Sequence, residues 1–391
     1  MLSVALTLLV ALQLSACATL PSARHAQFQS TLPVDTERFG PRPDIVDEVA
    51  VFTLSEAQQH AFLDYFYQPL REATPPHERV HDYLLQITRG FDFHNDTRTA
   101  SQVLSSASGN CLSLAILTTA LADLVEIDVD YQLVDGTPVF EQRGDIVSRG
   151  VHVRSILYDP RWQKITDGAS GARRPGIRFD YFPEDTKRVR LIGNLPYEAY
   201  VAMYYSNVAG EALAAGDRGA AFWLLREALR HDPGNAIALN TLAVVYRHAG
   251  DAATAERIYR YAIEHLPEKA SFLRNYVVLL TRQDRRQEAL EVSARLERLD
   301  DQNPFSWVAA GREAMAAGDY REAARYFEQA LDIAPYLHEA HAQLAIAYLH
   351  MGKRERAEQA LGLALENAPR RSTRSLYEAK LAVLDRRAGT P

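Results

Sequence analysis

Hydrophobic and polar positions divide the chain into segments with different periodicities. Residues 1–16 are almost wholly apolar, whereas residues 21–43 are polar with scattered prolines. From about residue 46 to residue 195, helical patterns are followed by strictly alternating ones, which are typical of strands. After residue 200 the composition turns to helix formers and the pattern repeats itself. We therefore predict an α+β domain followed by an all-α array of repeats.

Within the α+β region the pattern predicts helices followed by paired strands. Ser55 is suited to cap a first helix, and a second helix is expected to begin after Pro75-Pro76. Residues 111–125 are apolar nearly all round, which predicts a helix buried on most sides. The segments that follow are predicted as a strand, a loop, a second strand and a returning strand, at 127–134, 137–149, 151–157 and 162–167.

Cys111 stands where a turn of small residues, Ser108-Gly109-Asn110, runs into the apolar helix. A thiol in the first helical turn lies among unpaired backbone N–H groups and at the positive end of the helix dipole. Both favour the thiolate and lower the pKa of the thiol. The same N–H groups could hold a developing oxyanion. This position favours a nucleophile, but a single cysteine is also often a small buried hydrophobic residue, and the sequence leaves both interpretations open.

His152 is the candidate general base, because it is the only one of the 12 histidines between Cys111 and the repeats. A hairpin centred on Asp159-Pro160 places His152 opposite Asp167, or diagonal to it if the register shifts by two. Asp167 would then fix the tautomer of the imidazole, and Asp180 is the alternative acid, from a third strand. A histidine in a strand can equally be a structural residue with its hydrogen bonds satisfied.

These features together resemble the bacterial transglutaminase-like domain of the papain-type superfamily. The resemblance covers roughly residues 46–195 and depends on Gly-Asn-Cys-Leu-Ser at the helix start, a strand ending at Val134, and Val151-His152-Val153 before a hairpin. It implies a triad of Cys111, His152 and Asp167 in a cysteine peptidase, amidase or acyltransferase that uses no cofactor. Among the three predicted triad residues, the sequence around the acid Asp167 differs most from the family pattern. Glycine follows Asp167 where the family often has proline or phenylalanine.

The repeating half has a period of 34 residues, which separates Pro233 from Pro267 and Pro335 from Pro369. Small residues recur in step with these prolines in the first helix, the turn and the second helix: Ala209, Ala243, Gly311 and Ala345; Gly216, Gly250, Gly318 and Gly352; Ala221, Ala255, Ala323 and Ala357. The pattern resembles five tetratricopeptide repeats over residues 200–371, closed by a capping helix and tail over 372–391. Such repeats stack into a superhelix with a concave face, which implies a protein or peptide partner.

One equivalent position of the first helices is polar at one end of the array and apolar at the other. It carries Ser206, Asn240, Arg274, Val308 and Ala342 in turn. These side chains could line a peptide groove. A solvated face, or packing against the first domain, is the alternative for any one of them, and no residue pattern identifies a ligand.

The N-terminal segment indicates export and lipidation. Residues 1–16 have the length of a signal peptide and are short for a transmembrane span. Leu14-Ser15-Ala16-Cys17 resembles the lipobox of bacterial lipoproteins, which implies cleavage before Cys17 and a lipid anchor on its thiol. Ala18 resembles the signal for sorting to the outer membrane of the cell envelope, on its periplasmic face. Residues 17–45 would then be a tether. An uncleaved anchor helix is the alternative, and unchanged membrane partitioning of a Cys17→Ser variant would count against lipidation.

Composition excludes several other functions. A net charge of -7, with 43 Lys and Arg spread along the chain, argues against a nucleic acid partner. No His/Cys/Asp cluster has the spacing of metal ligands. The leading hypothesis is a lipid-anchored envelope thiol enzyme that forms a thioester from an amide and passes it to water or to an amine. Its repeats would recruit a protein or peptide. The alternative is a non-catalytic scaffold lipoprotein with an inactive transglutaminase-like domain.

Overall fold

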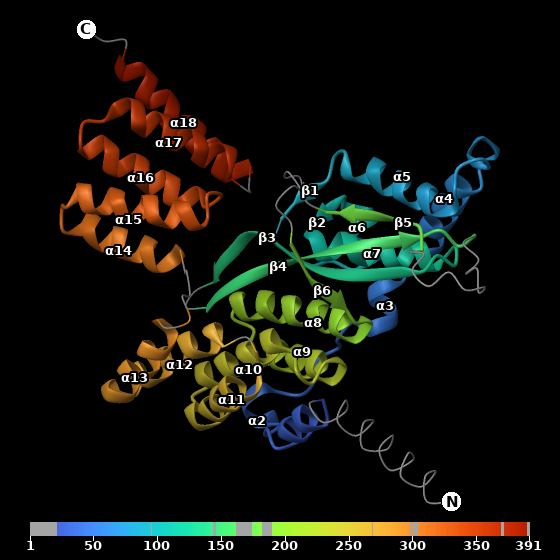
Figure 1. Ribbon diagram of the computed structural model, residues 1–391, viewed down its shortest axis with the longest axis horizontal. Helices are drawn as coiled ribbons and strands as arrows, with labels where there is room; N and C mark the ends of the chain where they lie inside the picture. Colours follow the sequence, from blue (N-terminus) through green and yellow to red (C-terminus); the bar gives the residue numbers. More distant parts are fainter. Residues whose placement is uncertain are drawn as a thin grey trace, which may run out of the picture. The chain divides into compact units, whose positions relative to one another are not determined.

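The computed structural model describes residues 22–94, 96–143, 146–161, 174–181, 190–267, 269–297, 299, 304–368 and 371–388 (Figure 1). The chain divides into two compact units, one formed by residues 1–53 and 194–299 and the other by residues 54–193 and 300–391. The predicted lipidation site Cys17 and the predicted acid Asp167 lie outside the described residues. In the part of the chain that is described, no helix is both long and apolar enough to cross a membrane.

The α+β region contains a four-stranded sheet with the order β5-β4-β3-β6 (Figure 1). The strands are β3 (Val129–Arg143), β4 (Ile146–Tyr158), β5 (Gly176–Asp180) and β6 (Arg190–Leu195). β4 pairs antiparallel with both β3 and β5. The two predicted strands are confirmed, but the loop predicted over 137–149 is wrong. β3 and β4 continue through most of that range as a hairpin, and their register shifts between Val134 and Val139. This irregularity breaks the alternation that the sequence pattern relies on.

The helices of this region pack against the sheet and against one another. They are α4 (Glu56–Phe66), α5 (Pro76–Thr88), α6 (Ala100–Ser106) and α7 (Cys111–Asp123), with a short 3-10 turn η1 (Pro69–Arg71) and a parallel pair β1 (Asp92–Phe93) and β2 (Ser108–Gly109). Ser55 caps α4 in a reciprocal capping box with Gln58, as predicted. Every residue of α7 from Leu112 to Ala122 is buried, which confirms the helix predicted from its apolar pattern. This burial explains why charged residues are absent from that stretch.

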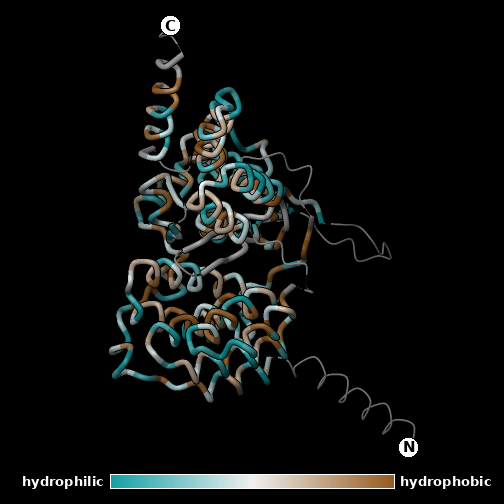
Figure 2. The backbone as a smooth tube through the Cα atoms, turned by 90° about the vertical axis from the view of Figure 1, so that its left-hand side faces the viewer, coloured by the Kyte–Doolittle hydropathy of each residue, from teal (hydrophilic) through white to brown (hydrophobic). Residues whose placement is uncertain are grey.

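Five antiparallel helix pairs and a closing helix make up the repeating half. The first helices are α8 (Tyr197–Ala214), α10 (Ala236–His248), α12 (Ala270–Arg282), α14 (Pro304–Ala316) and α16 (His338–His350). The second helices are α9 (Arg218–His231), α11 (Ala252–His265), α13 (Arg286–Glu297), α15 (Tyr320–Ile333) and α17 (Arg354–Glu366), and α18 (Arg371–Ala388) closes the series. Hydrophobic and hydrophilic positions alternate along these helices, as an amphipathic packing face requires (Figure 2).

The turns within the pairs explain the spacing of the glycines. Gly216, Gly250, Gly318 and Gly352 all have positive φ, between 72° and 87°, a conformation that glycine adopts without a steric cost. The third pair lacks this glycine, and Asp284 takes the left-handed conformation there with φ of 58°. Asp and Asn tolerate that conformation better than most residues, so the third pair keeps the same turn.

Residues 22–52, which we call the strap, pack along the helices of the first two repeats. The strap includes the short helices α2 (Thr36–Phe39) and α3 (Glu48–Phe52). Phe28 stacks on Tyr261 with ring centroids 3.7 Å apart, and Phe39 stacks on Phe222 at 4.1 Å. A tether is predicted over 17–45, but the described part of that range is a packed segment. Its aromatic side chains are the physical reason, since each finds an aromatic partner on the repeats.

Candidate functional site

Cys111 is the first residue of α7, at the position that the sequence predicts, and its side chain is partly exposed. Asn110 caps the helix by accepting a hydrogen bond from the Ser113 N–H at 2.9 Å. Ser113 Oγ accepts a hydrogen bond from the Arg98 N–H at 2.9 Å, and Asn110 Nδ2 donates to Thr97 Oγ1 at 2.8 Å. The helix start is therefore fixed on both sides, and the thiol lies at the end of α7 where the dipole stabilises a thiolate.

Tyr181 joins α7 to strand β4. Its hydroxyl lies 2.8 Å from Thr118 Oγ1 and 2.6 Å from Ser155 Oγ. Burial strongly raises the pKa of Tyr181, its hydrogen bonds to Ser155 and Thr118 lower it, and the nearby Tyr131 and Cys111 add to the rise. The phenol therefore stays neutral at physiological pH and serves as a fixed link between helix and strand.

The positions of Cys111 along α7 and of His152 along β4 can be compared through Tyr181, which is hydrogen-bonded to both elements. The end of α7 adjoins the start of β3, which pairs with the end of β4, so α7 and β4 run in the same direction. Cys111 precedes Thr118 by seven residues and His152 precedes Ser155 by three. Both separations are about 10 Å, because a helix rises 1.5 Å and a strand about 3.3 Å per residue. Along these axes Cys111 and His152 are thus at a similar height, and the alternation of β4 places His152 on the face of the strand opposite to Ser155.

His152 is buried, with 9% of its surface exposed, and pairs with Val134 at the last regular position before the register shift. Asp180, the alternative acid, lies opposite Arg154 on β4, and its carboxylate is 4.0 Å from the guanidinium. The described partner of Asp180 is thus a cation, and His152 lies two residues before Arg154 on the same face of β4. Among the described residues, no group of three or more His, Cys, Asp or Glu side chains is placed to hold a metal ion.

The predicted groove position of the repeats is mostly buried. Ser206 donates to the carbonyl of Ala202 in its own helix, and the Asn240 side chain accepts from Asn275 at 3.0 Å. Val308 and Ala342 are also buried, with 5% and 8% exposed. Arg274 alone of the five remains partly exposed. A groove lined by Ser206 and Asn240 is therefore not observed, because these polar side chains are used in internal hydrogen bonds.

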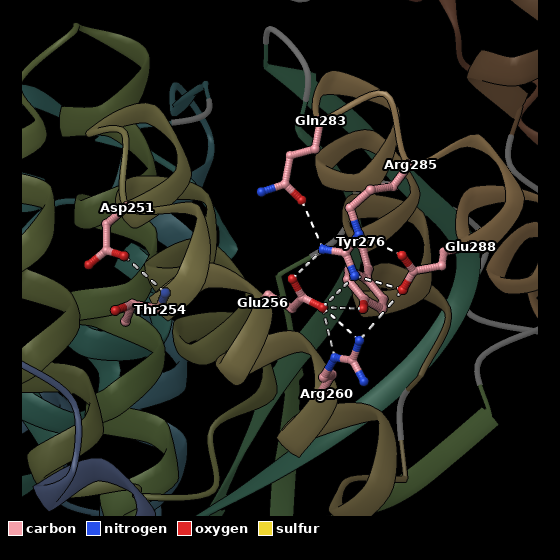
Figure 3. Close-up of polar contacts among 8 residues, drawn as sticks. All are labelled: Asp251, Thr254, Glu256, Arg260, Tyr276, Gln283, Arg285 and Glu288. Carbon is pink, nitrogen blue, oxygen red and sulfur yellow. Dashed lines mark hydrogen bonds and ion pairs between the residues drawn. The ribbon is translucent and has the colours of Figure 1, made fainter.

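A charged network links the second repeat to the third (Figure 3). Glu256 on α11 accepts from both Nη atoms of Arg285, at 2.6 and 3.0 Å, and from the Tyr276 hydroxyl at 2.7 Å. Arg260 adds an ion pair to the same carboxylate at 2.7 Å, and Arg285 also pairs with Glu288. These hydrogen bonds, with Arg285 contributing most, lower the pKa of Glu256 to about 2. The network fixes α11 against α12 and the start of α13.

Replacing Glu256 by glutamine is expected to destabilise the repeats near pH 7, and the difference from the parent protein is expected to shrink in acid. The pKa of Glu256 falls from 4.5 to about 2 on folding. The stabilisation is therefore complete above the higher value and is lost as the pH falls through the lower one. Urea unfolding near pH 7, 4 and 2.5 measures this dependence, with Glu264→Gln as control because that side chain is 75% exposed. A difference that is constant across the three pH values would contradict the account.

Two family models match the helical half of the chain. Both are described as tetratricopeptide repeat, and they match residues 224–257 and 314–382. The first match runs from α9 through α10 into α11, and the second runs from the end of α14 into α18. The helical half is built from tetratricopeptide repeats. Such repeats typically bind proteins or peptides, and neither of the two models covers the α+β region at 46–195.

Solved structures of other tetratricopeptide-repeat proteins are similar to about half of the chain. TTC0263 of Thermus thermophilus is 24% identical, over 46% of this chain and 99% of its own, with a TM-score of 0.32. PilF of Pseudomonas aeruginosa is 23% identical, over 48% and 92%, with a TM-score of 0.31. MamA of Desulfovibrio magneticus RS-1 is 16% identical, over 44% and 96%, with a TM-score of 0.25. No curated protein sequence matches the chain.

Two features of the first three repeats, the strap and the Glu256 network, are not predicted from the sequence. The signal for the strap is three phenylalanines, Phe28, Phe39 and Phe52, spaced along a segment whose first part is largely polar. Large apolar residues at regular intervals in a polar stretch indicate packing rather than a free tether. The network leaves no comparable signal, because Glu256 and Arg285 are 29 residues apart and charged residues are common on helix surfaces.

Proposed function

We propose that this protein is a scaffold whose tetratricopeptide repeats bind a protein or peptide partner. The observation that supports the proposal is that the repeats already hold a separate polypeptide segment, their own strap, through both its helical and its non-helical parts. Side chains of the repeats donate hydrogen bonds to strap carbonyls: Trp223 to Gly40 at 3.2 Å, Arg257 to Thr31 at 3.3 Å, Tyr246 to Pro33 at 2.5 Å and Tyr205 to Val46 at 3.0 Å. Contacts of this kind recognise a main chain whatever its sequence.

The strap also shows which chemistry gives these contacts their specificity. Its phenylalanines stack on aromatic side chains of the repeats, and Arg42 pairs with Glu227 at 2.8 Å. Aromatic anchors and charge-assisted hydrogen bonds are the contacts that contribute most to binding energy in protein interfaces. A partner that meets the surfaces left uncovered by the strap would use the same combination. We place its binding on the first helices, where Arg274 and Arg282 keep exposed surface.

A selection of peptides followed by titration tests this function. Residues 22–391 are immobilised, random twelve-residue peptides displayed on phage are selected, and the recovered sequences are synthesised and titrated by fluorescence anisotropy. We expect saturable binding that Arg274→Glu with Arg282→Glu weakens about tenfold or more. Arg286→Glu is the matched control, because its side chain is 85% exposed on α13. Failure to recover any saturable peptide, or equal affinity in both variants, would contradict the proposal.

A second candidate function is thiol chemistry in the α+β region, and the partly exposed position of Cys111 at the start of α7 favours it. In this proposal the Cys111 thiolate attacks an amide carbonyl, a C–S bond forms, and the C–N bond breaks as protonated His152 gives its proton to the leaving amine. The thioester is then cleaved by water or by a second amine. The N–H groups at the start of α7 would stabilise the oxyanion.

The pH dependence of alkylation discriminates this candidate from an inactive domain. We expect iodoacetamide to modify Cys111 with an apparent pKa well below the free-thiol value of about 8.5. His152→Ala should return the profile towards that value, whereas His60→Ala, at an exposed position of α4, should change it less. Mass spectrometry at matched times measures the modified fraction. A wild-type profile at the free-thiol pKa, or labelling only after denaturation, would rule out the thiol chemistry. The scaffold function would then be the one that remains.

A further inference from the structure

We propose that a cavity between the second and third repeats binds a carboxylate of a peptide partner, an inference that builds on the proposed scaffold function. The cavity has a volume of about 410 Å³ and is lined by Arg260, Ile263, Glu264, Lys269, Tyr276 and Arg295. These residues come from α11, the residue that precedes α12, α12 itself and α13. The lining thus belongs largely to second helices, unlike the concave surface that first helices form in such arrays.

The lining is rich in positive charge. Arg260, Lys269 and Arg295 contribute three cations, against the single carboxylate of Glu264, whose side chain is 75% exposed. Arg260 is already paired with Glu256, but the side chains of Lys269 and Arg295 have no ion pair or hydrogen bond with any described residue. Three cations against one largely exposed carboxylate give the concave site a net positive charge, which favours a negatively charged ligand. Their carboxylate neighbours Glu256 and Glu288 are both engaged by Arg285.

The opposite wall of the cavity is held in place before any ligand arrives. The Arg260 guanidinium carbon lies 5.7 Å from the centre of the Tyr276 ring, and both side chains are bound to Glu256 (Figure 3). Because Arg285 secures Glu256 from the other side, the wall cannot easily rotate away. A preformed wall reduces the entropy that binding would otherwise cost.

The apolar part of the lining distinguishes a peptide from a simple anion. Ile263 and Tyr276 are each only 5% exposed, so they offer a small hydrophobic surface beside the cations. An inorganic anion would use the cations and leave this surface unused. A peptide that carries a carboxylate next to an apolar side chain would use both, and the volume suits a side chain of that size.

Matched synthetic peptides test the proposal. The probes are fluorescein-labelled Gly-Phe-Glu-Leu-Gly with an amidated end, the same peptide with glutamine for glutamate, and the glutamine peptide with a free C-terminal carboxylate. Anisotropy titrations at low and high NaCl use the parent protein, Lys269→Ala with Arg295→Ala, and the exposed control Arg286→Ala. We expect the parent to prefer the glutamate peptide by about tenfold at low salt. The double variant should lose that preference, and the control should keep it.

The third peptide identifies the source of the carboxylate. Equal binding of the glutamate peptide and the free-carboxylate glutamine peptide supports a site that accepts a side-chain or a C-terminal carboxylate. Preference for one of these peptides identifies which of the two carboxylates the site binds. Equal binding of both amidated peptides, no binding of either, or a preference that survives in the double variant would overturn the proposal. Displacement of the glutamate peptide by millimolar inorganic phosphate would also overturn it in favour of a simple anion site. If phage-selected peptides still bind in any of these cases, the scaffold function stands without this cavity.

Discussion

Phe39→Ala is expected to lower the free energy of unfolding of the first repeats by about 3–4 kcal/mol, the usual range for removing a buried phenylalanine. Phe39 is 5% exposed, stacks on Phe222 and meets the edge of Tyr246 at 5.5 Å. The backbone leaves little space for compensation, because the Phe39 carbonyl lies 2.6 Å from the place where a Cβ on Gly219 would stand. After the ring is removed, the strap and α9 therefore cannot close up fully, and a cavity remains between them.

Urea unfolding followed by tryptophan fluorescence measures this loss, because Trp223 Nε1 donates to the carbonyl of Gly40 next to the substituted residue. Limited proteolysis should in parallel show faster cleavage within residues 22–52. Val49→Ala in the same strap is the matched control, since Val49 is 75% exposed and its loss should cost little. If the two variants unfolded at the same urea concentration, the strap would not be part of the folded repeats.

The repeats could be predicted well from the sequence because their signals are local and recur in register. The 34-residue spacing of the prolines and of the turn glycines depends on contacts within one helix pair. The positive φ of Gly216 and Gly250 confirms that these glycines end the first helix of their pairs. The third pair is harder to place, because Asp284 supplies the same left-handed turn with a residue that is common elsewhere. The sequence pattern predicts a tether in place of the strap, since Phe39 and Phe222 are far apart in the sequence.

The candidate thiol site could be predicted in part. The helix that starts at Cys111, with Asn110 as its cap, follows from a small-residue turn before an apolar run. Gly109 is required there, because its φ is 147° and a Cβ would lie 2.9 Å from the Ser113 side chain. Tyr181 could not be assigned its role, since its hydrogen bonds reach Thr118, 63 residues away, across an element order that the pattern does not fix. Pairings between distant strands are set by tertiary packing rather than by local sequence.

Gly311→Ala is expected to destabilise the fourth repeat by up to about 2 kcal/mol, although alanine is the better helix former. A Cβ at this position would lie 2.5 Å from Cε1 of Phe327, whose ring is fully buried in the core of the last repeats. Overpacking of that kind costs about 1–3 kcal/mol, and the gain in helix propensity of about 1 kcal/mol offsets part of it.

Gly362→Ala supplies the matched control, because this glycine lies within α17 and a Cβ there would have no atom within 4 Å. Its expected effect has the opposite sign, a stabilisation of about 0.5–1 kcal/mol from propensity alone. Thermal unfolding of the two variants beside the parent measures both shifts under the same conditions. A stabilisation in both would mean that α14 and α15 can separate to accept a methyl group. A close crossing of the two helices in each pair would then not be the reason for the small residue in the first helix.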